Sequence, residues 1–289
     1  MTAIYASGYA KLNLYLNVIG KRDDGYHDIE SVMQTISLRD DMEILIGTKE
    51  PWVVDSDRED VPCNEENICW KAAKLFFEKT HIDPDGLTVH ILKRIPMGAG
   101  LAGGSTDAAA LLRALDVYYG KPLSLDELCL LGSQVGSDVP FCILGGTAIT
   151  EEKGNKLFPI NHPPQLFYVV CKPEASLSTK EMYEQLDRDG IPACDDTRKI
   201  VTGIRNHNVQ QIARNLYNVF EPLAVRQVPE IAKVKQQLKQ YGALNAMMTG
   251  SGSAVFGVFD KIETAFDACE KLSAKYPDTF LATNQIEED

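Results

Sequence analysis

Residues 96–110 read PMGAGLAGGSTDAAA, and this glycine-rich stretch decides the fold expected for the chain. Four of its first nine residues are glycine, which lets the backbone approach a ligand closely. Ser105, Thr106 and Asp107 then begin an Ala/Leu-rich segment that predicts a helix. The first N–H groups of a helix have no partner within it and favour an anion, so the stretch predicts a phosphate-binding loop. The hydroxyl groups of Ser105 and Thr106 are candidates to reach phosphate oxygens or Mg²⁺.

Other interpretations of this loop differ in what should follow it. A plain helix entry does not need four glycines. A Walker A loop is excluded because no Gly-Lys-Ser/Thr sequence follows. Gly98, Gly100 and Gly103 match the dinucleotide-binding fingerprint, but that motif requires a second strand ending in an acidic residue about 20 positions later. A second helical pattern follows instead, and residues 121–123 read Lys-Pro-Leu at that place, which disfavours a dinucleotide site.

The chain of 289 residues exceeds the usual size of one domain, so two domains are expected. The charged, glycine-containing stretch at residues 151–156, EEKGNK, predicts the boundary between domains 1–156 and 157–289. Hairpin patterns come first and helical patterns later, which predicts an α+β fold and not a repeating βαβ fold.

Several strands and helices are predicted from local pattern. Residues 29–38, 41–46 and 139–149 are predicted as strands, the last interrupted by a glycine pair. Residues 67–80 predict an amphipathic helix, and Ser124-x-x-Glu127 is a capping box that begins another. Residues 9–19 alternate and predict a strand with one buried side. Its apolar side holds Leu12, Leu14, Leu16 and Val18, and its polar side holds Lys11, Asn13, Tyr15 and Asn17.

Composition excludes several classes of protein. The formal charge of −12 argues against a nucleic-acid surface, although local cations, backbone N–H groups and Mg²⁺ can still bind phosphate. The seven cysteines contain no C-x-x-C pair, so neither a zinc site nor a disulfide framework is predicted. The N-terminus has no signal-peptide pattern, and no run approaches the roughly 20 apolar residues of a membrane span. A cytoplasmic protein without membrane contact is expected, and the oligomeric state is not indicated.

The glycine-rich loop resembles the phosphate-binding motif of the GHMP kinases, a family that includes galactokinase and the homoserine, mevalonate and phosphomevalonate kinases. Two further blocks occur in the order typical of that family: AKLNL at residues 10–14 and MTGSGSAVF at residues 248–256. The resemblance spans roughly residues 8–260. It implies a two-domain α+β fold with the active site in a cleft between the domains. It also implies transfer of the γ-phosphoryl group of ATP, with Mg²⁺, to an alcohol.

Within the family, the best match is to members that phosphorylate a sugar alcohol linked to cytidine diphosphate. Residues 25–27 (GYH), 136–141 (GSDVPF), 218–221 (NVFE) and 66–67 (EN) carry this finer resemblance. It implies a small-molecule substrate of that kind. A kinase for homoserine or a mevalonate-type acceptor is the first alternative. A nucleotide-binding protein without catalysis is the second.

The resemblance assigns roles that the residues alone leave open. Asp138 would accept the proton of the substrate hydroxyl, although it also fits an ordinary turn carboxylate. Lys11 would keep Asp138 ionised and stabilise the transferring charge, although it also fits a solvated cation. Asn13 would bind the substrate near the reacting hydroxyl. Tyr26 and His27 would hold the cytosine, a pair that is otherwise typical of turn packing.

Nucleotide and substrate contacts are implied in the same way. Thr179 and Tyr183 would lie on the substrate side, although their segment also reads as an ordinary helix start. Asn67 and Lys93 would lie near the adenine and ribose. The nucleotide loop implied by the resemblance comprises Pro96, Met97, Gly98, Ala99, Gly100, Leu101, Ala102, Gly103, Gly104, Ser105 and Thr106.

The chain departs from the family pattern at a few positions. Ala102 replaces a glycine of the loop, and Thr106 replaces a serine while keeping the hydroxyl. Glu151 and Glu152 stand where a Gly-x-Gly-Glu turn is usual, and two carboxylates beside a polyphosphate are unfavourable unless they face solvent. Near the C-terminus, Gly250 and Gly252 are predicted to let the third motif, residues 248–256, pack against the phosphate loop.

Overall fold

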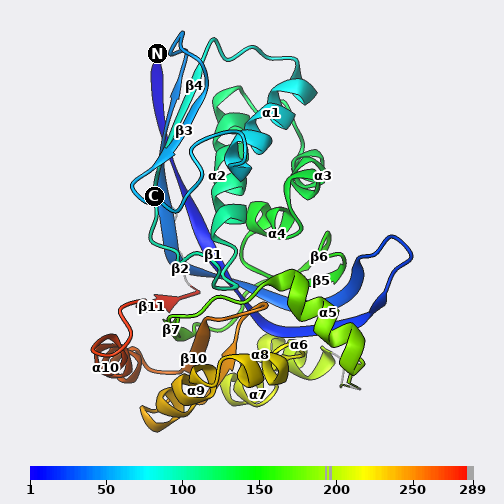
Figure 1. Cartoon of the computed structure of the whole chain (residues 1–289), viewed down its shortest axis with the longest axis vertical. Coiled ribbons are helices and arrows are strands. Elements are labelled where there is room, and N and C mark those ends of the chain that lie inside the picture. The colour runs from blue at the N-terminus through cyan, green and yellow to red at the C-terminus, as the bar shows by residue number, and fades with distance from the viewer. Residues whose placement is uncertain (193, 195–196, 285–289) are drawn as a thin grey trace. The chain divides into compact units, whose positions relative to one another are not determined.

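The computed structural model describes residues 1–192, 194 and 197–284, and its chain forms two compact units (Figure 1). Both units are discontinuous, because strands β1 (Thr2–Lys21) and β2 (His27–Ile46) contribute residues to each. The division into domains 1–156 and 157–289, with a site between them, stays a prediction. Unit 1 comprises Met1–Ala10, Arg39–Ile95 and Ala102–Gly145, and unit 2 comprises Lys11–Leu38, Pro96–Leu101 and Gly146–Asp289.

Unit 1 is a small sheet with helices on one side of it (Figure 1). Residues 41–46 of β2 pair antiparallel with β4, and β3 pairs parallel with β4. The further elements of this unit are β3 (Val53–Ser56), α1 (Ile68–Thr80), β4 (Leu87–Leu92), α2 (Gly103–Tyr118), α3 (Leu125–Val135) and α4 (Val139–Leu144).

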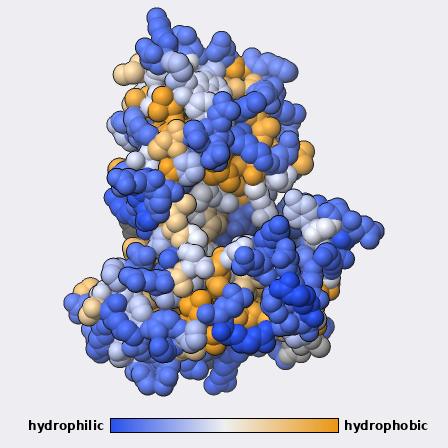
Figure 2. Space-filling model, in the orientation of Figure 1, coloured by the Kyte–Doolittle hydropathy of each residue, from blue (hydrophilic) through white to orange (hydrophobic). Residues whose placement is uncertain are grey.

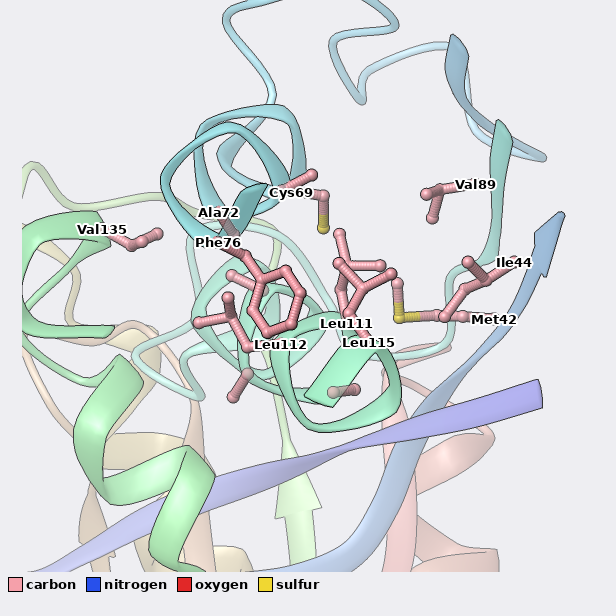
Figure 3. Close-up of a cluster of buried hydrophobic side chains, with 14 of the residues drawn as sticks. Met42, Ile44, Cys69, Ala72, Phe76, Val89, Leu111, Leu112, Leu115 and Val135 are labelled. Atoms are coloured by element: carbon pink, nitrogen blue, oxygen red, sulfur yellow. The ribbon is translucent and has the colours of Figure 1, made fainter. Parts of the chain in front are cut away.

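The core of unit 1 lies between these helices and the strands. Figure 3 shows Phe76 of α1 beside Leu111, Leu112 and Leu115 of α2, with Val89 of β4 on the strand side. All five side chains are buried. Because the helix after the glycine loop supplies so much of this core, its N-terminus is held in a fixed place.

Two predicted helices of unit 1 begin with a side-chain cap. Asn67 caps α1, and its Oδ1 accepts a hydrogen bond from the N–H of Cys69 at 2.9 Å. Ser124 caps α3 and forms both bonds of the capping box with Glu127. The two caps satisfy N–H groups that would otherwise have no partner. The predicted capping box at Ser124 and the predicted helix over residues 67–80 are confirmed, whereas the cap at Asn67 was not predicted.

Unit 2 contains a four-stranded antiparallel sheet in the order β11-β7-β10-β9. Helices α9 and α10 cover one side of it (Figure 1), and their apolar side chains form its core. Residues 29–34 of β2 pair with β5, and β5 pairs with β6. The strands of this unit that start after residue 146 are β5 (Thr147–Glu152), β6 (Lys156–Pro159), β7 (Phe167–Cys171), β8 (Tyr217–Asn218), β9 (Asn245–Met248), β10 (Val255–Phe259) and β11 (Thr279–Thr283). Its helices are α5 (Thr179–Asp189), α6 (Arg198–Arg205), α7 (Val209–Arg214), α8 (Glu221–Gln227), α9 (Glu230–Gln240) and α10 (Ile262–Ser273).

The predicted strand at residues 139–149 is wrong in its first half. Residues 139–144 form the helix α4, and only residues 147–149 belong to a strand, β5. Pro140 stands in the first turn of α4, where a proline with its fixed φ favours a helix start. Gly145 has φ of +72° and ends the helix. A short buried apolar run has the same pattern in a helix and in a strand, which explains the error.

Two further expectations about strands need correction. Residues 29–38 and 41–46 were expected as separate strands, but β2 runs through both without a break. The strand at residues 9–19 was expected to have one buried side, but both sides of β1 are buried there, including Lys11 and Asn13. Polar side chains on a covered face need hydrogen-bond partners within the protein.

The surface has the character expected of a charged chain. Figure 2 shows a mostly hydrophilic face with hydrophobic side chains in small patches. Among the residues that the structure describes, no helix combines the length and apolar character needed to cross a membrane.

Candidate active site

The helix that follows the glycine loop begins as an anion site requires. Ala102 precedes α2 with φ of +61°, and no side chain of the described residues caps the helix. The hydroxyl of Thr106 donates to the carbonyl of Gly103 at 2.8 Å, which makes it part of the first turn. A Cβ at Gly103 would lie 3.1 Å from the side chain of Ile95, so glycine fits closely there. The uncapped N–H groups of the first turn therefore remain available to an anion such as a phosphate.

Ala102 is strained in this position, and we expect Ala102→Gly to stabilise the protein. The left-handed region disfavours any residue with a Cβ by roughly 1 kcal/mol, and glycine removes that cost. The free energy of unfolding in urea should rise by about 1 kcal/mol. Ala114→Gly in the interior of α2 is the matched control and should lower it by about 1 kcal/mol. An equal decrease in the free energy of unfolding for both variants would contradict the strain at Ala102.

A buried network of three charges lies beside the same helix start. Lys93 donates through Nζ to Asp40 and, at 2.6 Å, to Oδ2 of Asp107 in α2. The other oxygen of Asp40 accepts from the N–H groups of Arg94 and Ile95 at 2.5 and 2.8 Å. The network therefore ties the residues just before the glycine loop to the first turns of the helix after it.

The charge balance of this network is uneven, because one ammonium group faces two carboxylates. The Lys93 side chain is only 1% exposed. Burial raises the pKa of Asp107 to about 8, and Lys93 opposes this rise. Lys93 was predicted to lie near the nucleotide, and that contact stays a prediction. In the structure, its ammonium group supports the loop through Asp40 and Asp107.

Asn67 and Asp138 lie on other turns of unit 1. Asn67 uses Oδ1 to cap α1 and donates through Nδ2 to the carbonyl of Pro62 at 2.7 Å, so its contact with adenine stays a prediction. Asp138 directly precedes α4, is partly exposed, and makes no capping hydrogen bond with that helix. A Cβ added to Gly136 would lie 3.8 Å from Oγ of Ser105, so the turn that carries Asp138 adjoins the first turn of α2.

Lys11 is buried and bound to the glycine loop within unit 2. Its Nζ donates to Oδ1 of Asn13 at 2.7 Å and to the carbonyl of Gly100 at 2.9 Å. Its backbone N–H donates to the carbonyl of Leu101 at 3.1 Å. With 3% of its surface exposed, Lys11 is not a solvated surface cation. A buried ammonium group in this place provides positive charge beside the loop.

Asn13 connects the first motif (residues 10–14) to the third motif (residues 248–256). Its N–H donates to Oγ1 of Thr249 at 3.0 Å, and its side-chain amide donates to Oγ of Ser31 at 2.9 Å. The amide oxygen accepts from Lys11, so the side chain has a fixed orientation. Its predicted contact with the substrate is not shown and stays a prediction.

The third motif packs directly on the glycine loop. A Cβ at Gly100 would lie 2.2 Å from the carbonyl oxygen of Thr249, and a Cβ at Gly250 would lie 2.9 Å from the carbonyl oxygen of Gly100. The N–H of Ala254 donates to the carbonyl of Ala99 at 3.2 Å. This confirms the prediction for Gly250. Gly252 also adjoins the loop, because a Cβ at Gly100 would lie 3.2 Å from its backbone nitrogen, and a Cβ at Gly252 itself would meet the side chain of Met248.

Two residues that support the third motif had no predicted role. Asn218 donates through Nδ2 to the carbonyls of Met248 and Gly250, both at 2.8 Å. Glu221 accepts from the N–H of Met248 at 2.7 Å and pairs with Lys235. Both lie in the NVFE segment, so the family resemblance of that segment was the available signal. They hold the loop that packs against Gly100.

The predicted cytosine clamp comprises one exposed and one covered side chain. Tyr26 is 63% exposed, and Nζ of Lys153 lies 4.2 Å from its ring centroid. The His27 side chain is 7% exposed and stacks on Tyr183, with ring centroids 4.6 Å apart. Nε2 of His27 lies 2.7 Å from Oδ1 of Asp187. The structure thus brings His27 and Tyr183 together, and their contact with a base stays a prediction.

Other predicted substrate-side contacts lie along α5. The hydroxyl of Thr179 is 2.7 Å from Oγ of Ser251, which joins α5 to the third motif. Tyr183 also packs edge-on against Phe220, with ring centroids 4.8 Å apart. These contacts order the helix that carries both predicted residues.

Glu151 and Glu152 lie in the hairpin of β5 and β6. Glu151 pairs in register with Lys156, and the half-exposed Glu152 carboxylate is 3.9 Å from the ammonium group of Lys156. The two glutamates line a groove of about 440 Å³. Its other lining residues are Ile19, Arg22, Asp28, Ile29 and Glu30.

Comparison with known families identifies the class of this protein. Residues 67–146 match the family described as GHMP kinases N terminal domain, and residues 200–278 match GHMP kinases C terminal. Together the two matches cover more than half of the chain. The chain therefore belongs to the GHMP kinase family, and the predicted family and α+β fold are confirmed.

Two similar proteins of this family carry the same enzyme name. The 4-diphosphocytidyl-2-C-methyl-D-erythritol kinase of Caldicellulosiruptor saccharolyticus is 41% identical over 275 residues, which cover 95% of this chain and 94% of that protein. The enzyme of the same name from Clostridium botulinum is 40% identical over 276 residues, covering 96% and 98%.

Solved structures of similar fold include an enzyme with the activity named for these relatives. A crystal structure of 4-(cytidine 5'-diphospho)-2C-methyl-D-erythritol kinase matches with a TM-score of 0.81 and 29% identity, over 97% of this chain and 98% of that chain. The homoserine kinase of Cytophaga hutchinsonii matches with a TM-score of 0.77 at 16% identity, over 99% and 95%. The second similarity shows a shared fold alone.

Proposed function

We propose that this chain is a kinase that transfers the γ-phosphoryl group of ATP to the 2-hydroxyl of 4-diphosphocytidyl-2-C-methyl-D-erythritol. The observation that carries this proposal is identity of about 40% along nearly the whole chain to enzymes of that name. The sequence resemblance at residues 25–27 and 136–141 supports the same acceptor. The step belongs to non-mevalonate isoprenoid synthesis, and a cytoplasmic location stays a prediction.

Binding of the nucleotide follows from the uncapped start of α2. The triphosphate is an anion, and the free N–H groups of the first turn donate to it. The glycines at positions 98, 100, 103 and 104 leave the backbone accessible. Loop residues 96–106 therefore bind ATP in this proposal.

Phosphoryl transfer depends mainly on positioning and charge stabilisation. Asp138 accepts the proton of the substrate hydroxyl as that oxygen attacks the γ-phosphorus and the bond to the β-phosphate oxygen breaks. Lys11, fixed by Asn13 and Gly100, stabilises negative charge on the transferring group. Asn13 orients the acceptor near its reacting hydroxyl.

Mg²⁺ fits this donor set. It keeps several waters and usually binds one or two protein oxygens together with the phosphates of the substrate. The hydroxyl of Ser105, on the first turn of α2, is an oxygen donor of this kind. Mg²⁺ would neutralise charge on the phosphates as the γ-phosphoryl group leaves.

The acceptor is identified by ADP release from MgATP, measured separately with 4-diphosphocytidyl-2-C-methyl-D-erythritol, homoserine and mevalonate. We expect turnover with the cytidine compound alone, and ³¹P NMR of the product should show a new phosphomonoester. Turnover with homoserine or mevalonate instead would keep the kinase class and reject the proposed acceptor. ATP binding without transfer to any of the three would favour a protein without this catalysis.

A further inference from the structure

His27 is the first residue of β2. Two side chains of α5, one helical turn apart, contact its imidazole. Tyr183 stacks on the ring at 26° between planes, and Asp187 lies 2.7 Å from Nε2. Side chains at positions i and i+4 of a helix lie on one face, so both reach the same target. The ring therefore has a fixed plane and one fixed nitrogen.

Lys21 fixes the carboxylate in turn. Its Nζ lies 2.6 Å from Oδ2 of Asp187, while Oδ1 faces His27. The bonds from Lys21 and then from His27 lower the pKa of Asp187, so the carboxylate is ionised and can only accept hydrogen bonds. Nε2 of His27 must then carry the hydrogen.

The second ring nitrogen of His27 is consequently an acceptor whenever the imidazole is neutral. Among the described residues, Nδ1 of His27 has no hydrogen-bond partner. It is also not fully buried, because it does not belong to the buried polar atoms that lack a partner. Its acceptor capacity is therefore left unused by the described residues. Cytosine presents an amino donor at position 4, whereas uracil presents a carbonyl acceptor at the same place.

We infer that Asp187 is a positioning residue that sets the base specificity of this enzyme by fixing the tautomer of His27. The inference rests on the proposed function, because it requires the cytosine of the substrate to lie against His27. Nδ1 accepts a hydrogen bond from the 4-amino group of cytosine, and it would face the 4-carbonyl oxygen of uracil without a hydrogen between them.

The variant Asp187→Asn reverses the tautomer, for a reason that Lys21 supplies. A lysine only donates, so it selects the oxygen of the new amide and turns the NH₂ group toward His27. Nε2 must then accept, and Nδ1 carries the hydrogen. The N–H at Nδ1 can donate a hydrogen bond to the 4-carbonyl oxygen of uracil, but it would face the 4-amino donor of cytosine.

The first test observes the tautomer without substrate. Two-bond ¹H–¹⁵N spectra of the histidine rings at pH 8 distinguish a hydrogen on Nε2 from one on Nδ1, and His27→Gln assigns the signal. We expect Nε2–H in the native protein and Nδ1–H in Asp187→Asn. Asp189→Asn, on the same helix and paired with Arg226, is the matched control and should keep Nε2–H. An unchanged tautomer in Asp187→Asn would overturn the inference.

The second test measures kcat/KM for the CDP-linked acceptor and for its UDP-linked analogue. We expect Asp187→Asn to lower the CDP/UDP preference at least 10-fold, with Asp189→Asn unchanged. Lys21→Met combined with Asp187→Asn frees the amide to rotate and should restore part of the preference. Equal losses with both acceptors would make Asp187 a purely structural residue. If the native protein uses neither acceptor, the proposed function fails, and the spectra alone still decide the tautomer.

Discussion

Replacing Lys93 by methionine is expected to lower the free energy of unfolding by about 3–5 kcal/mol, because it removes one partner from a buried ionic network. Asp40, and Asp107 at a pH above its raised pKa, would remain charged in the core with no cation between them. The methionine matches the length of the lysine and leaves no large cavity. The loss therefore measures the uncompensated charge.

The pH dependence of this loss has a definite sign. Burial raises the pKa of Asp107 to about 8, so the stability linked to its proton is complete below the unfolded pKa and is lost as the pH rises through about 8. Without Lys93, which opposes the rise, the pKa of Asp107 goes higher. The folded variant then binds more protons than the folded native protein near pH 8. The difference in stability between the two should therefore widen from pH 6 to pH 9.

Urea unfolding at pH 6 and pH 9 checks both statements. Lys74→Met, at an exposed position of α1, is the matched control and should change the free energy of unfolding by less than about 0.5 kcal/mol. A loss at Lys93 as small as that at Lys74 would show that water or rearrangement relieves the two carboxylates. A difference that narrows with rising pH would contradict the raised pKa of Asp107.

The sequence predicts those parts of the fold that have local causes. The capping box of Ser124 and Glu127, the amphipathic helix near residues 67–80 and the glycine-rich helix start each depend on residues a few positions apart. Each is present as predicted. The error at residues 139–144 has a local cause too, since an apolar run of that length has no period that separates helix from strand.

The supporting network of the site could not be predicted, because its partners are distant in the chain. Asp40 and Lys93 are 53 positions apart, and Asp187 lies 160 positions after His27. Alternation in residues 9–19 indicated a strand but gave no sign that its polar side is also covered. Only tertiary packing decides whether Lys11 faces water or the carbonyl of Gly100.

Asp138→Asn is expected to lower kcat by about 10²–10⁴-fold, the usual contribution of a general base. An amide cannot accept the proton of the substrate hydroxyl. The change should cost little stability, because asparagine has the shape of aspartate and suits a position before a helix equally well. The KM for ATP should change little, since the glycine loop and the start of α2 are unaltered.

Steady-state kinetics with saturating MgATP and the CDP-linked acceptor give the comparison, and urea unfolding confirms that the variant is folded. Asp126→Asn, an exposed aspartate in the first turn of α3, is the matched control and should keep native turnover. If Asp138→Asn kept turnover within a few-fold of native, the hydroxyl would lose its proton without this carboxylate. Transfer would then depend on charge stabilisation by Lys11, the loop and Mg²⁺, which a loose transition state with little need of a base permits. A loss of 10² or more with an unchanged KM for ATP instead places the proton transfer at Asp138.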